Sequence, residues 1–288
     1  MKKAGVNKKT ATLMGVALVL VALAIWTIWG NAALLVNEIT VYSNRLPASF
    51  SGFRIAHISD LHNAEFGKEN ATLLRMLSDC KPDAIVITGD LVDAYHADVE
   101  IATHFAKESG KIAPTYYVTG NHEASLFQYS ELRERLKAAG VVVLQDELIH
   151  LEKDGESMVL LGLDDPNFTM KTTLLNEVPA MIGARIKNML EQENDYSVLL
   201  SHRPELFEVY VSCGVDLVLS GHAHGGQFRL PFVGGVIAPD QGLFPQYDAG
   251  LYTDSNTNMI VSRGLGNSII PIRFNNRPEI VLIELKAQ

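Results

Sequence analysis

The sequence predicts an α/β fold in which two mixed β-sheets pack together. Three observations support this expectation. Helical and strand-like segments alternate through most of the chain after about residue 37, and strand-like segments then follow one another toward the C-terminus. The chain has 288 residues, of which 47% are hydrophobic, so a large core can form. Polar residues also follow the ends of several apolar strand-like segments, as expected in open α/β sheets.

The first 36 residues are expected to be a basic tail and a single-pass transmembrane helix, followed by one globular domain over 37–288. Residues 11–29 are uncharged and apolar, close to the roughly 20 residues that span a bilayer. Trp26 and Trp29 lie near its far end, where aromatic residues favour the membrane interface. The alternative is a cleaved signal peptide, for which only a poor small-residue site follows at Ala32 and Ala33.

Four lysines within the first nine residues indicate the orientation of this helix. Positive charges tend to stay on the cytoplasmic side of a membrane. We therefore expect a protein of the cell membrane with a cytoplasmic N-terminus and an extracytoplasmic domain.

Strands and helices are predicted from periodicity and from turn residues. Helix 68–78 places Leu73, Leu74 and Leu77 on one face and ends before Pro82, and Gly140 ends another helix. Residues 153–156 form the turn of a predicted hairpin. The expected helices are 68–78, 98–108, 130–139, 180–192 and 204–212. The expected strands are 38–42, 53–59, 84–88, 115–119, 141–144, 148–152, 157–163, 197–200, 216–219 and 279–285.

Composition limits the possible partners. The net charge of −9 argues against nucleic-acid binding, for which a basic surface is expected. An acidic protein that acts on an anion needs a local positive charge, and a bound metal supplies one. Cys80 and Cys213 are expected to be two buried thiols, with a disulfide as the alternative.

The loop Gly221-His222-Ala223-His224-Gly225-Gly226 follows the predicted strand 216–219. Alternate residues of an extended segment point the same way, so the two imidazoles can converge. Neutral imidazole is a common ligand of transition metals. This loop therefore indicates a metal site; a polar loop that happens to contain histidines is the alternative.

Residues suited to metal binding follow five predicted strands. They are Asp60 and His62, Asp90, Asn121 and His122, His202, and His222 and His224. One such residue alone is often a turn cap or a structural histidine, but five strand ends together indicate one crevice. The set suits two divalent ions, which when about 4 Å apart clamp the oxygens of a displacement at phosphorus.

The same blocks resemble the calcineurin-like metallophosphoesterases. They are Asp60-x-His62, Gly89-Asp90, Gly120-Asn121-His122-Glu123, His202 and Gly221-His222-x-His224, in that order. The strings 222–231, 262–266 and 271–274 further resemble the bacterial membrane-associated branch typified by YkuE and YaeI. The resemblance implies a four-layer α/β/β/α sandwich of two mixed sheets, with the catalytic domain over 37–288.

The resemblance also implies roles for single residues. Asp60, His62 and His224 would hold one metal, Asn121, His202 and His222 the other, and Asp90 would bridge them. His122 would face the substrate, stabilise the phosphoryl oxygens and protonate the leaving group. Asp93 would orient His122, with a turn carboxylate as the alternative. No substrate-binding residue is assigned.

The expected function is therefore hydrolysis of a phosphoester bond, in a phosphodiester or a pyrophosphate, by a hydroxide held between the two ions. The ligand set suits Mn, Fe, Zn or Ni. Few residues separate the apolar segment from the first strand, so a lipid head group or a cell-envelope polymer is a plausible substrate. The alternatives are a membrane-anchored metal-binding recognition module without turnover, and a binuclear hydrolase of carbon esters or amides.

Five further polar residues carry open alternatives. Asp164 and Asp165 precede Pro166 and are expected in a turn, with contact to the substrate or to site residues as the alternative. Arg229, Arg263 and Arg273 flank glycine-rich turns. One of them could bind a phosphate through its guanidinium, and structural pairing is the alternative for each.

Overall fold

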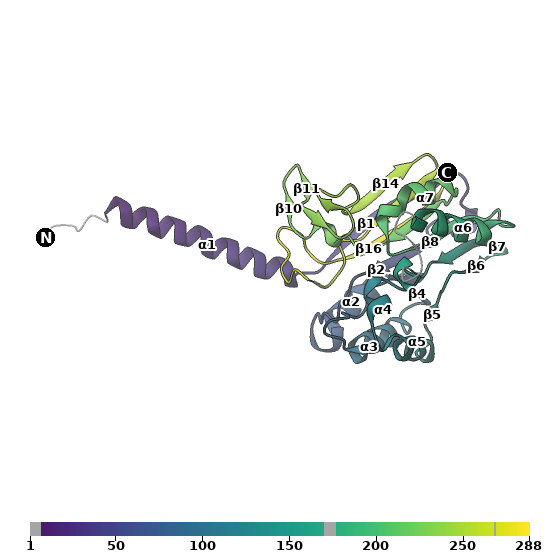
Figure 1. Ribbon diagram of the computed structural model, residues 1–288, viewed down its shortest axis with the longest axis horizontal. Coiled ribbons are helices and arrows are strands. Elements are labelled where there is room, and N and C mark those ends of the chain that lie inside the picture. Colours follow the sequence, from purple (N-terminus) through teal and green to yellow (C-terminus); the bar gives the residue numbers. More distant parts are fainter. Residues whose placement is uncertain (1–6, 170–176, 268) are drawn as a thin grey trace.

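The computed structural model describes residues 7–169, 177–267 and 269–288 as a long N-terminal helix and a two-sheet domain (Figure 1). Helix α1 spans Lys8–Ala32 and projects away from the domain. Its 25 residues make it about 37 Å long, against about 30 Å for the hydrocarbon core of a bilayer. By length and composition it is able to cross a membrane.

The first sheet has six strands in the order β1-β16-β2-β3-β4-β5. Its pairs are parallel except for β16 with β2. The strands are β1 (Leu35–Ser43), β2 (Arg54–Ile58), β3 (Ala84–Thr88), β4 (Thr115–Val118), β5 (Val142–Val143) and β16 (Glu279–Ala287). The carboxyl ends of β2, β3 and β4 therefore meet at one edge of this sheet.

The second sheet also has six strands, in the order β14-β15-β9-β8-β7-β6. The inner pairs are parallel, and the outer pairs β14 with β15 and β6 with β7 are antiparallel. The strands are β6 (Glu147–Lys153), β7 (Glu156–Gly162), β8 (Tyr196–Leu200), β9 (Leu217–Ser220), β14 (Gly250–Asp254) and β15 (Thr257–Val261). The site residues after β8 and β9 thus also share one edge.

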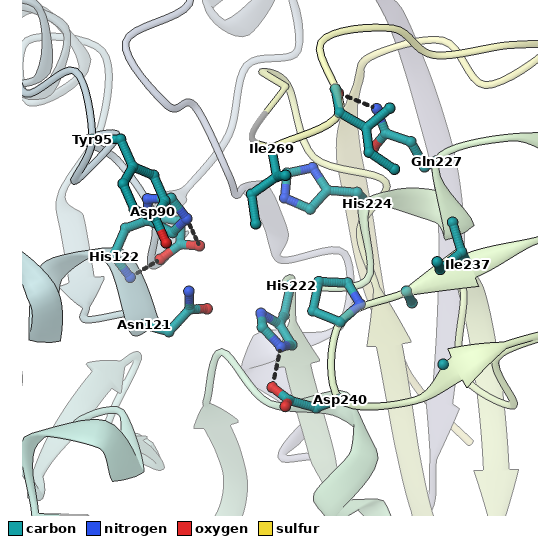
Figure 2. Close-up of a pocket in the computed structure, with 14 residues that line it drawn as sticks. Asp90, Tyr95, Asn121, His122, His222, His224, Gln227, Ile237, Asp240 and Ile269 are labelled. Carbon is teal, nitrogen blue, oxygen red and sulfur yellow. Dashed lines mark hydrogen bonds and ion pairs between the residues drawn. The ribbon is translucent and has the colours of Figure 1, made fainter. Parts of the chain in front are cut away.

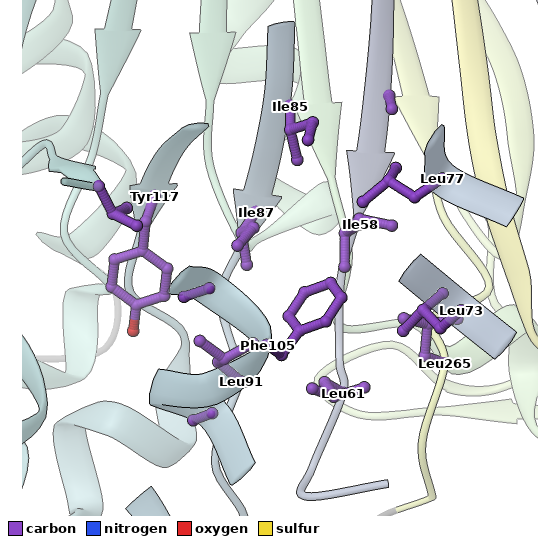
Figure 3. Packing of buried hydrophobic residues seen from close by; sticks show 14 of the residues in the cluster. Ile58, Leu61, Leu73, Leu77, Ile85, Ile87, Leu91, Phe105, Tyr117 and Leu265 are labelled. Atoms are coloured by element: carbon purple, nitrogen blue, oxygen red, sulfur yellow. The ribbon is translucent and has the colours of Figure 1, made fainter. Parts of the chain in front are cut away.

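Three apolar clusters separate four layers. One joins the first sheet to α2 (Ala71–Asp79), α3 (Val99–Ser109) and α5 (Tyr129–Ala138), with Phe105 at its centre (Figure 3). The second lies between the two sheets, and the third joins the second sheet to α6 (Val178–Leu190) and α7 (Phe207–Ser212). The predicted α/β/β/α sandwich of two mixed sheets is confirmed.

The structure adds elements that the sequence did not predict. Residues 204–212 form a 3₁₀ turn, Pro204–Leu206, before α7, where one helix was expected. Four two-residue strands make the hairpins β10 (Arg229–Leu230) with β11 (Gly234–Gly235), and β12 (Ile237–Ala238) with β13 (Gly242–Leu243). These segments are too short for periodicity to reveal them.

Two further sequence predictions concern the cysteines and the domain boundary. Cys80 is buried, Cys213 is half-buried, and both are free thiols, so the disulfide alternative does not apply. Strand β1 begins at Leu35, just before the predicted boundary at residue 37, which stays a prediction.

Candidate metal centre

The predicted site residues converge at the facing edges of the two sheets. Figure 2 shows Asp90, Asn121, His122, His222 and His224 among them. Those from the first sheet follow β2, β3 and β4, and those from the second follow β8 and β9. Asn121 and His122 also open the short helix α4 (Asn121–Ser125), which starts directly after β4. Except for Asn121, which is half-buried, every predicted ligand is at least nine-tenths buried.

A close approach at Gly221 joins the two sheets at this edge. A Cβ atom at Gly221 would lie 1.8 Å from Ser59 Oγ and 2.4 Å from Asp60 Oδ2, so only glycine fits there. The next residue, His222, donates its backbone N–H to the Asp60 carboxylate at 3.1 Å from Oδ2. This contact aligns the loop after β9 with the loop after β2.

Asp60, His62 and His224 form the first group of donor atoms. The Nε2 atoms of His62 and His224 lie 3.2 Å apart, and His224 Nε2 lies 3.3 Å from Asp60 Oδ1. The three donors are all buried.

Asp90, His202 and His222 form the second group. His202 Nε2 is 3.1 Å from His222 Nδ1 and 3.2 Å from Asn121 Oδ1. Asp90 Oδ2 lies 3.2 Å from His202 Nε2 and 3.6 Å from His62 Nε2, so this one carboxylate reaches both groups. His222 and His224, two residues apart in the chain, lie in different groups.

This donor set fits cations. In both groups two imidazole nitrogens face each other at hydrogen-bonding distance, and their lone pairs repel unless a proton or a metal ion lies between them. His202 Nδ1 lies 2.7 Å from the carbonyl of Thr88, a geometry in which Nδ1 donates, so Nε2 carries the lone pair whenever the ring is neutral. Imidazole nitrogen and carboxylate oxygen together suit transition metals.

The imidazoles of the two groups differ in their pKa values. Burial lowers the pKa of His62 to about 4 and that of His224 to about 3, so both imidazoles are neutral at pH 7. Burial also acts to lower the pKa of His202, but the charge of Asp90 and its hydrogen bond outweigh that effect and raise the pKa to about 10. Metal binding in the second group therefore displaces a proton from His202.

The backbone at the site is strained. Asp60, His62, Asp90, His222 and His224 have φ angles between 45° and 66°, in the left-handed region. Asp and His tolerate this region better than most residues, yet each such conformation costs of the order of 1–3 kcal/mol. Backbone strain of this kind gathers at functional sites, where the surrounding fold enforces it.

His122 lies beside the two donor groups and belongs to neither of them. Its Nε2 lies 4.0 Å from Asp90 Oδ2, and its Nδ1 accepts a hydrogen bond from the backbone N–H of Ala94 at 3.0 Å. A ring that accepts at Nδ1 carries its proton at Nε2, on the side of the metal groups. In this geometry the side chain is a hydrogen-bond donor toward the cavity.

Asp93 forms the turn that the sequence allowed as the alternative. Its Oδ1 accepts the backbone N–H of Tyr95 at 2.7 Å and of His96 at 3.2 Å, which is a turn. The same atom lies 3.9 Å from His122 Nδ1, too far for a hydrogen bond, so the orienting role of Asp93 stays a prediction.

Glu123 is a buried residue to which the sequence analysis assigned no role. Its carboxylate accepts the backbone N–H groups of Gly120 at 2.7 Å, Asp90 at 2.8 Å, Leu91 at 2.9 Å and Val92 at 3.2 Å. Burial and the charge of Asp90 raise its pKa to about 7, against these donors. Glu123 thus ties the loop after β3 to the loop after β4 and fixes the backbone of Asp90.

Asp240 is a second residue that the sequence analysis missed. His222 Nε2 lies 2.9 Å from Asp240 Oδ2, and Arg203 also contacts this carboxylate. The hydrogen bond from His222 and the charge of Arg203 hold the pKa of Asp240 well below its usual range. The same Nε2 lies 3.1 Å from Arg203 Nη1. In the tautomer that donates its Nε2 proton to Asp240, Nδ1 of His222 is free to bind a metal. In sequence, Asp240 sits in a Pro-Asp-Gln-Gly turn and has no distinguishing signal.

The remaining candidates are mainly structural. Asp165 caps a short turn and also holds Arg203 through two ion-pair contacts at 2.5 and 2.9 Å, so it reaches the site through that arginine. Arg229 pairs with Asp248 at 2.9 Å, and Arg263 lies 3.6 Å from Glu279. Asp164, the other carboxylate before Pro166, accepts the Thr119 hydroxyl at 2.9 Å.

Arg273 is fully buried rather than facing a solvent-exposed anion. Its guanidinium donates to the carbonyls of Arg263 at 2.6 Å and of Gly266 at 2.5 Å. Burial lowers its pKa to about 10, so it still carries its charge at pH 7.

A pocket of about 440 Å³ opens beside the donor groups. One wall carries the site residues and Tyr95, and the opposite wall is apolar (Figure 2). The apolar lining consists of Ile237, Ala238, Pro239, Ile269 and Ile270.

Asp240→Asn tests whether this carboxylate orients His222. The amide is neutral and its oxygen is a weaker acceptor, so the metal affinity of the second group is expected to fall by roughly 10- to 100-fold. Isothermal titration of the metal-free protein with Mn²⁺ or Zn²⁺ measures the change. Asp154→Asn, at an exposed hairpin turn, is the matched control. Equal affinities for the two variants would contradict this role of Asp240.

Residues 53–226 match the calcineurin-like phosphoesterase family. The chain is 31% identical over 262 residues to the uncharacterized metallophosphoesterase YkuE of Bacillus subtilis, covering 87% of this chain and 85% of YkuE. It is 29% identical over 248 residues to the phosphodiesterase YaeI of Escherichia coli, covering 81% of this chain and 82% of YaeI.

A solved structure has the same fold. The protein TT1561 of Thermus thermophilus aligns with a TM-score of 0.51 at 13% identity, over 74% of this chain and 90% of TT1561. The predicted resemblance is confirmed by the family match, which spans the five site loops from Asp60 to His224. The chain therefore belongs to the calcineurin-like phosphoesterase family, as a metal-dependent phosphoesterase of the branch that includes YkuE and YaeI.

Proposed function

We propose that this chain hydrolyses a phosphodiester or pyrophosphate bond at a dinuclear metal centre. The observation that supports this most directly is that Asp90 reaches two separate donor groups, 3.2 Å from His202 and 3.6 Å from His62. One carboxylate between two ligand sets is what a pair of ions requires. YaeI, a relative of similar length, is a phosphodiesterase, which favours a diester.

The two groups divide the ligands between the ions. Asp60, His62 and His224 hold one ion, Asn121, His202 and His222 the other, and Asp90 contributes to both. When bound, the divalent ions supply an activated water and positive charge for the phosphoryl oxygens. Mn, Fe, Zn and Ni all accept this mixture of nitrogen and oxygen donors.

His122 acts on the substrate as a hydrogen-bond donor. Its Nδ1 accepts from Ala94, so its proton sits at Nε2, which faces the pocket beside Asp90. A neutral imidazole in this tautomer stabilises a phosphoryl oxygen by donating to it. It is a poor acid toward a leaving group, because loss of the Nε2 proton would leave an imidazolate. Asp93 holds the loop that carries Ala94.

The second part of the proposal concerns location and substrate. Helix α1 crosses the membrane. The four N-terminal lysines keep the start of the helix in the cytoplasm, so the domain lies on the other side of the membrane. Only two residues separate α1 from β1, so the pocket stays close to the bilayer. A lipid head group or a cell-envelope phosphodiester is therefore the proposed substrate class.

Asp90→Asn tests the catalytic centre. The amide keeps an oxygen for the backbone N–H of His122, and asparagine tolerates the left-handed backbone, so the fold is retained. Loss of the shared charge is expected to lower metal-dependent hydrolysis of bis(p-nitrophenyl) phosphate by more than about 100-fold. Asp154→Asn is the control, and circular dichroism monitors folding.

Three results would overturn the catalytic proposal. Full activity of Asp90→Asn would exclude the shared carboxylate. A metal-loaded wild-type protein that cleaves p-nitrophenyl acetate but no phosphorus ester would favour the carbon-ester alternative, and one that cleaves neither would favour a recognition module.

His122→Ala separates a hydrogen-bond donor from a general acid. Removing a donor slows all substrates alike, by roughly 100- to 1,000-fold. Removing a general acid slows substrates with poor leaving groups far more. We therefore expect the wild-type to variant ratio of kcat to stay constant across aryl methyl phosphates whose phenols span a range of pKa. A ratio that rises with the phenol pKa would show that His122 protonates the leaving group.

Removal of residues 1–28 tests the membrane proposal. This truncation leaves Trp29 and Asn31, which contact the domain through Arg277 and Arg273. Hydrolysis of soluble bis(p-nitrophenyl) phosphate is expected to be unchanged, whereas hydrolysis of a phosphodiester lipid in vesicles falls. If the truncated and the full-length protein hydrolyse the vesicle lipid at equal rates, the anchor makes no contribution to lipid turnover.

A further inference from the structure

An unusual group of exposed apolar side chains surrounds the pocket mouth. Eight of the thirteen exposed large apolar side chains described after α1 lie in two short segments. We name these eight residues the apolar rim. They are Leu230, Phe232, Val233, Ile237, Leu243, Phe244, Ile269 and Ile272. Single exposed apolar residues are ordinary, but a group of them marks an interaction surface.

Two segments far apart in sequence form the apolar rim together. The side chain of Gln227 donates to the carbonyls of Ile270 and Ile272 at 2.7 and 2.8 Å. The backbone N–H of Arg229 donates to the carbonyl of Phe274 at 3.0 Å. Ile237 and Ile269 also line the pocket, so the rim is continuous with the apolar wall that faces the donor groups (Figure 2).

The same segment is bonded to the end of α1. The Asn31 side chain donates to the carbonyl of Arg273 at 2.8 Å and accepts the backbone N–H of Arg273 at 2.8 Å. The guanidinium of Arg277 donates to the carbonyls of Ala33 and Leu34 and lies 4.8 Å from the ring centre of Trp29. In Figure 1, β10 and β11 lie on the side of the domain from which α1 projects.

Two phenylalanines of the apolar rim are held in a costly backbone conformation. Phe232 has φ 68° and a fully exposed side chain, and Phe244 has φ 56° and is 63% exposed. A bulky residue with positive φ is an outlier. Packing within the chain does not offset this cost, because both rings face outward. Such outliers indicate a role outside the fold.

The charge of the apolar rim suits a bilayer that contains anionic lipid. Residues 229–244 and 266–278 include a single acidic residue, Asp240, which pairs with Arg203 and His222, although the whole chain has a net charge of −9. Arg229 and Arg277 lie within these segments. A surface beside α1 whose one carboxylate is already paired repels anionic head groups little.

We infer that the apolar rim inserts into the lipid bilayer beside the end of α1, and that the apolar pocket wall takes an acyl chain of the substrate. This inference rests on the proposed phosphoesterase function for its substrate, but the membrane contact itself does not. The pocket mouth then opens onto the lipid, and a phosphoester that carries an acyl chain reaches the donor groups without passing through water. Amphipathic surfaces of this kind bind at the boundary between head groups and acyl chains.

Spin labels test the membrane contact on the full-length protein. Cysteine replaces Phe232, Phe244 or Phe127 in a Cys213→Ser background, since the other native thiol, Cys80, is buried. Phe127 is the matched control, because it is 99% exposed and lies just before α5, which Figure 1 shows on a different side of the domain from β10 and β11. The proteins are reconstituted in nanodiscs of phosphatidylethanolamine and phosphatidylglycerol.

The expected result is a difference in reagent access. Labels at 232 and 244 are reached by oxygen, which concentrates in lipid, and are protected from a water-soluble nickel chelate. The label at 127 is reached by the chelate. Equal chelate access at 232 and 127 would overturn the inference. Protection of 232 from both reagents, with dipolar broadening between labels, would instead indicate contact with a second copy and would also overturn it.

A pair of matched substrates tests the acyl chain. Phe232→Asp is expected to slow hydrolysis of hexadecyl p-nitrophenyl phosphate in the same bilayers by about tenfold or more. A charge in place of the inserted apolar ring lowers the partitioning of the rim into the bilayer by at least about tenfold. Hydrolysis of soluble methyl p-nitrophenyl phosphate is expected to be unchanged. Equal rates of wild type and variant on the hexadecyl substrate would exclude the lipid route. If the wild type cleaves neither substrate, the proposed function fails, while the spin labels still decide the membrane contact.

Discussion

The close approach of the two sheets at Gly221 is the constraint on which the metal centre depends. The donor atoms come from both sheets, so neither sheet alone contains a complete group. Even one Cβ atom at Gly221 would overlap Ser59 and Asp60, and the backbone N–H of His222 bonds to the Asp60 carboxylate in the space that remains. The apolar cluster between the sheets holds them at this separation. Packing of the core therefore determines the geometry of the chemistry.

The centre concentrates features that are unfavourable for folding. Five predicted ligands have left-handed backbones, and buried carboxylates lie beside buried imidazoles. Glu123 offsets part of this cost, because its carboxylate satisfies four backbone N–H groups around Asp90 and Gly120. Asp240 and Asp165 likewise pair with the buried guanidinium of Arg203. Bound cations would stabilise the folded chain further, since they bind the folded state and satisfy the facing imidazole nitrogens.

The donor groups, the apolar rim and the end of α1 lie close together in the domain. The pocket has a polar wall made by strand ends and an apolar wall made by the segments after His224. Those segments are bonded to the end of α1 through Asn31, which is 242 residues from Arg273 in sequence. A single structural unit thus links α1, the exposed phenylalanines and the donor groups. This arrangement accounts for apolar residues that would be a liability on a freely soluble surface.

Local sequence patterns determined most of the elements and the identity of the site residues. Asp60, Asp90, Asn121, His202 and His222 could be predicted because parallel strands bring their carboxyl ends to one edge, so a polar residue after each apolar segment is a local signal of a shared site. The tertiary structure decided the rest. Glu123 and Asp240 act through contacts across 18 to 33 residues of sequence, for which periodicity carries no signal. The tautomer of His122 depends on the Ala94 backbone, and the apolar rim forms only when the segments near Phe232 and Ile269 fold together. The local sequence specifies the chemistry of each side chain. The distances between side chains, their burial and their orientation arise from the packing of segments that are far apart in the chain.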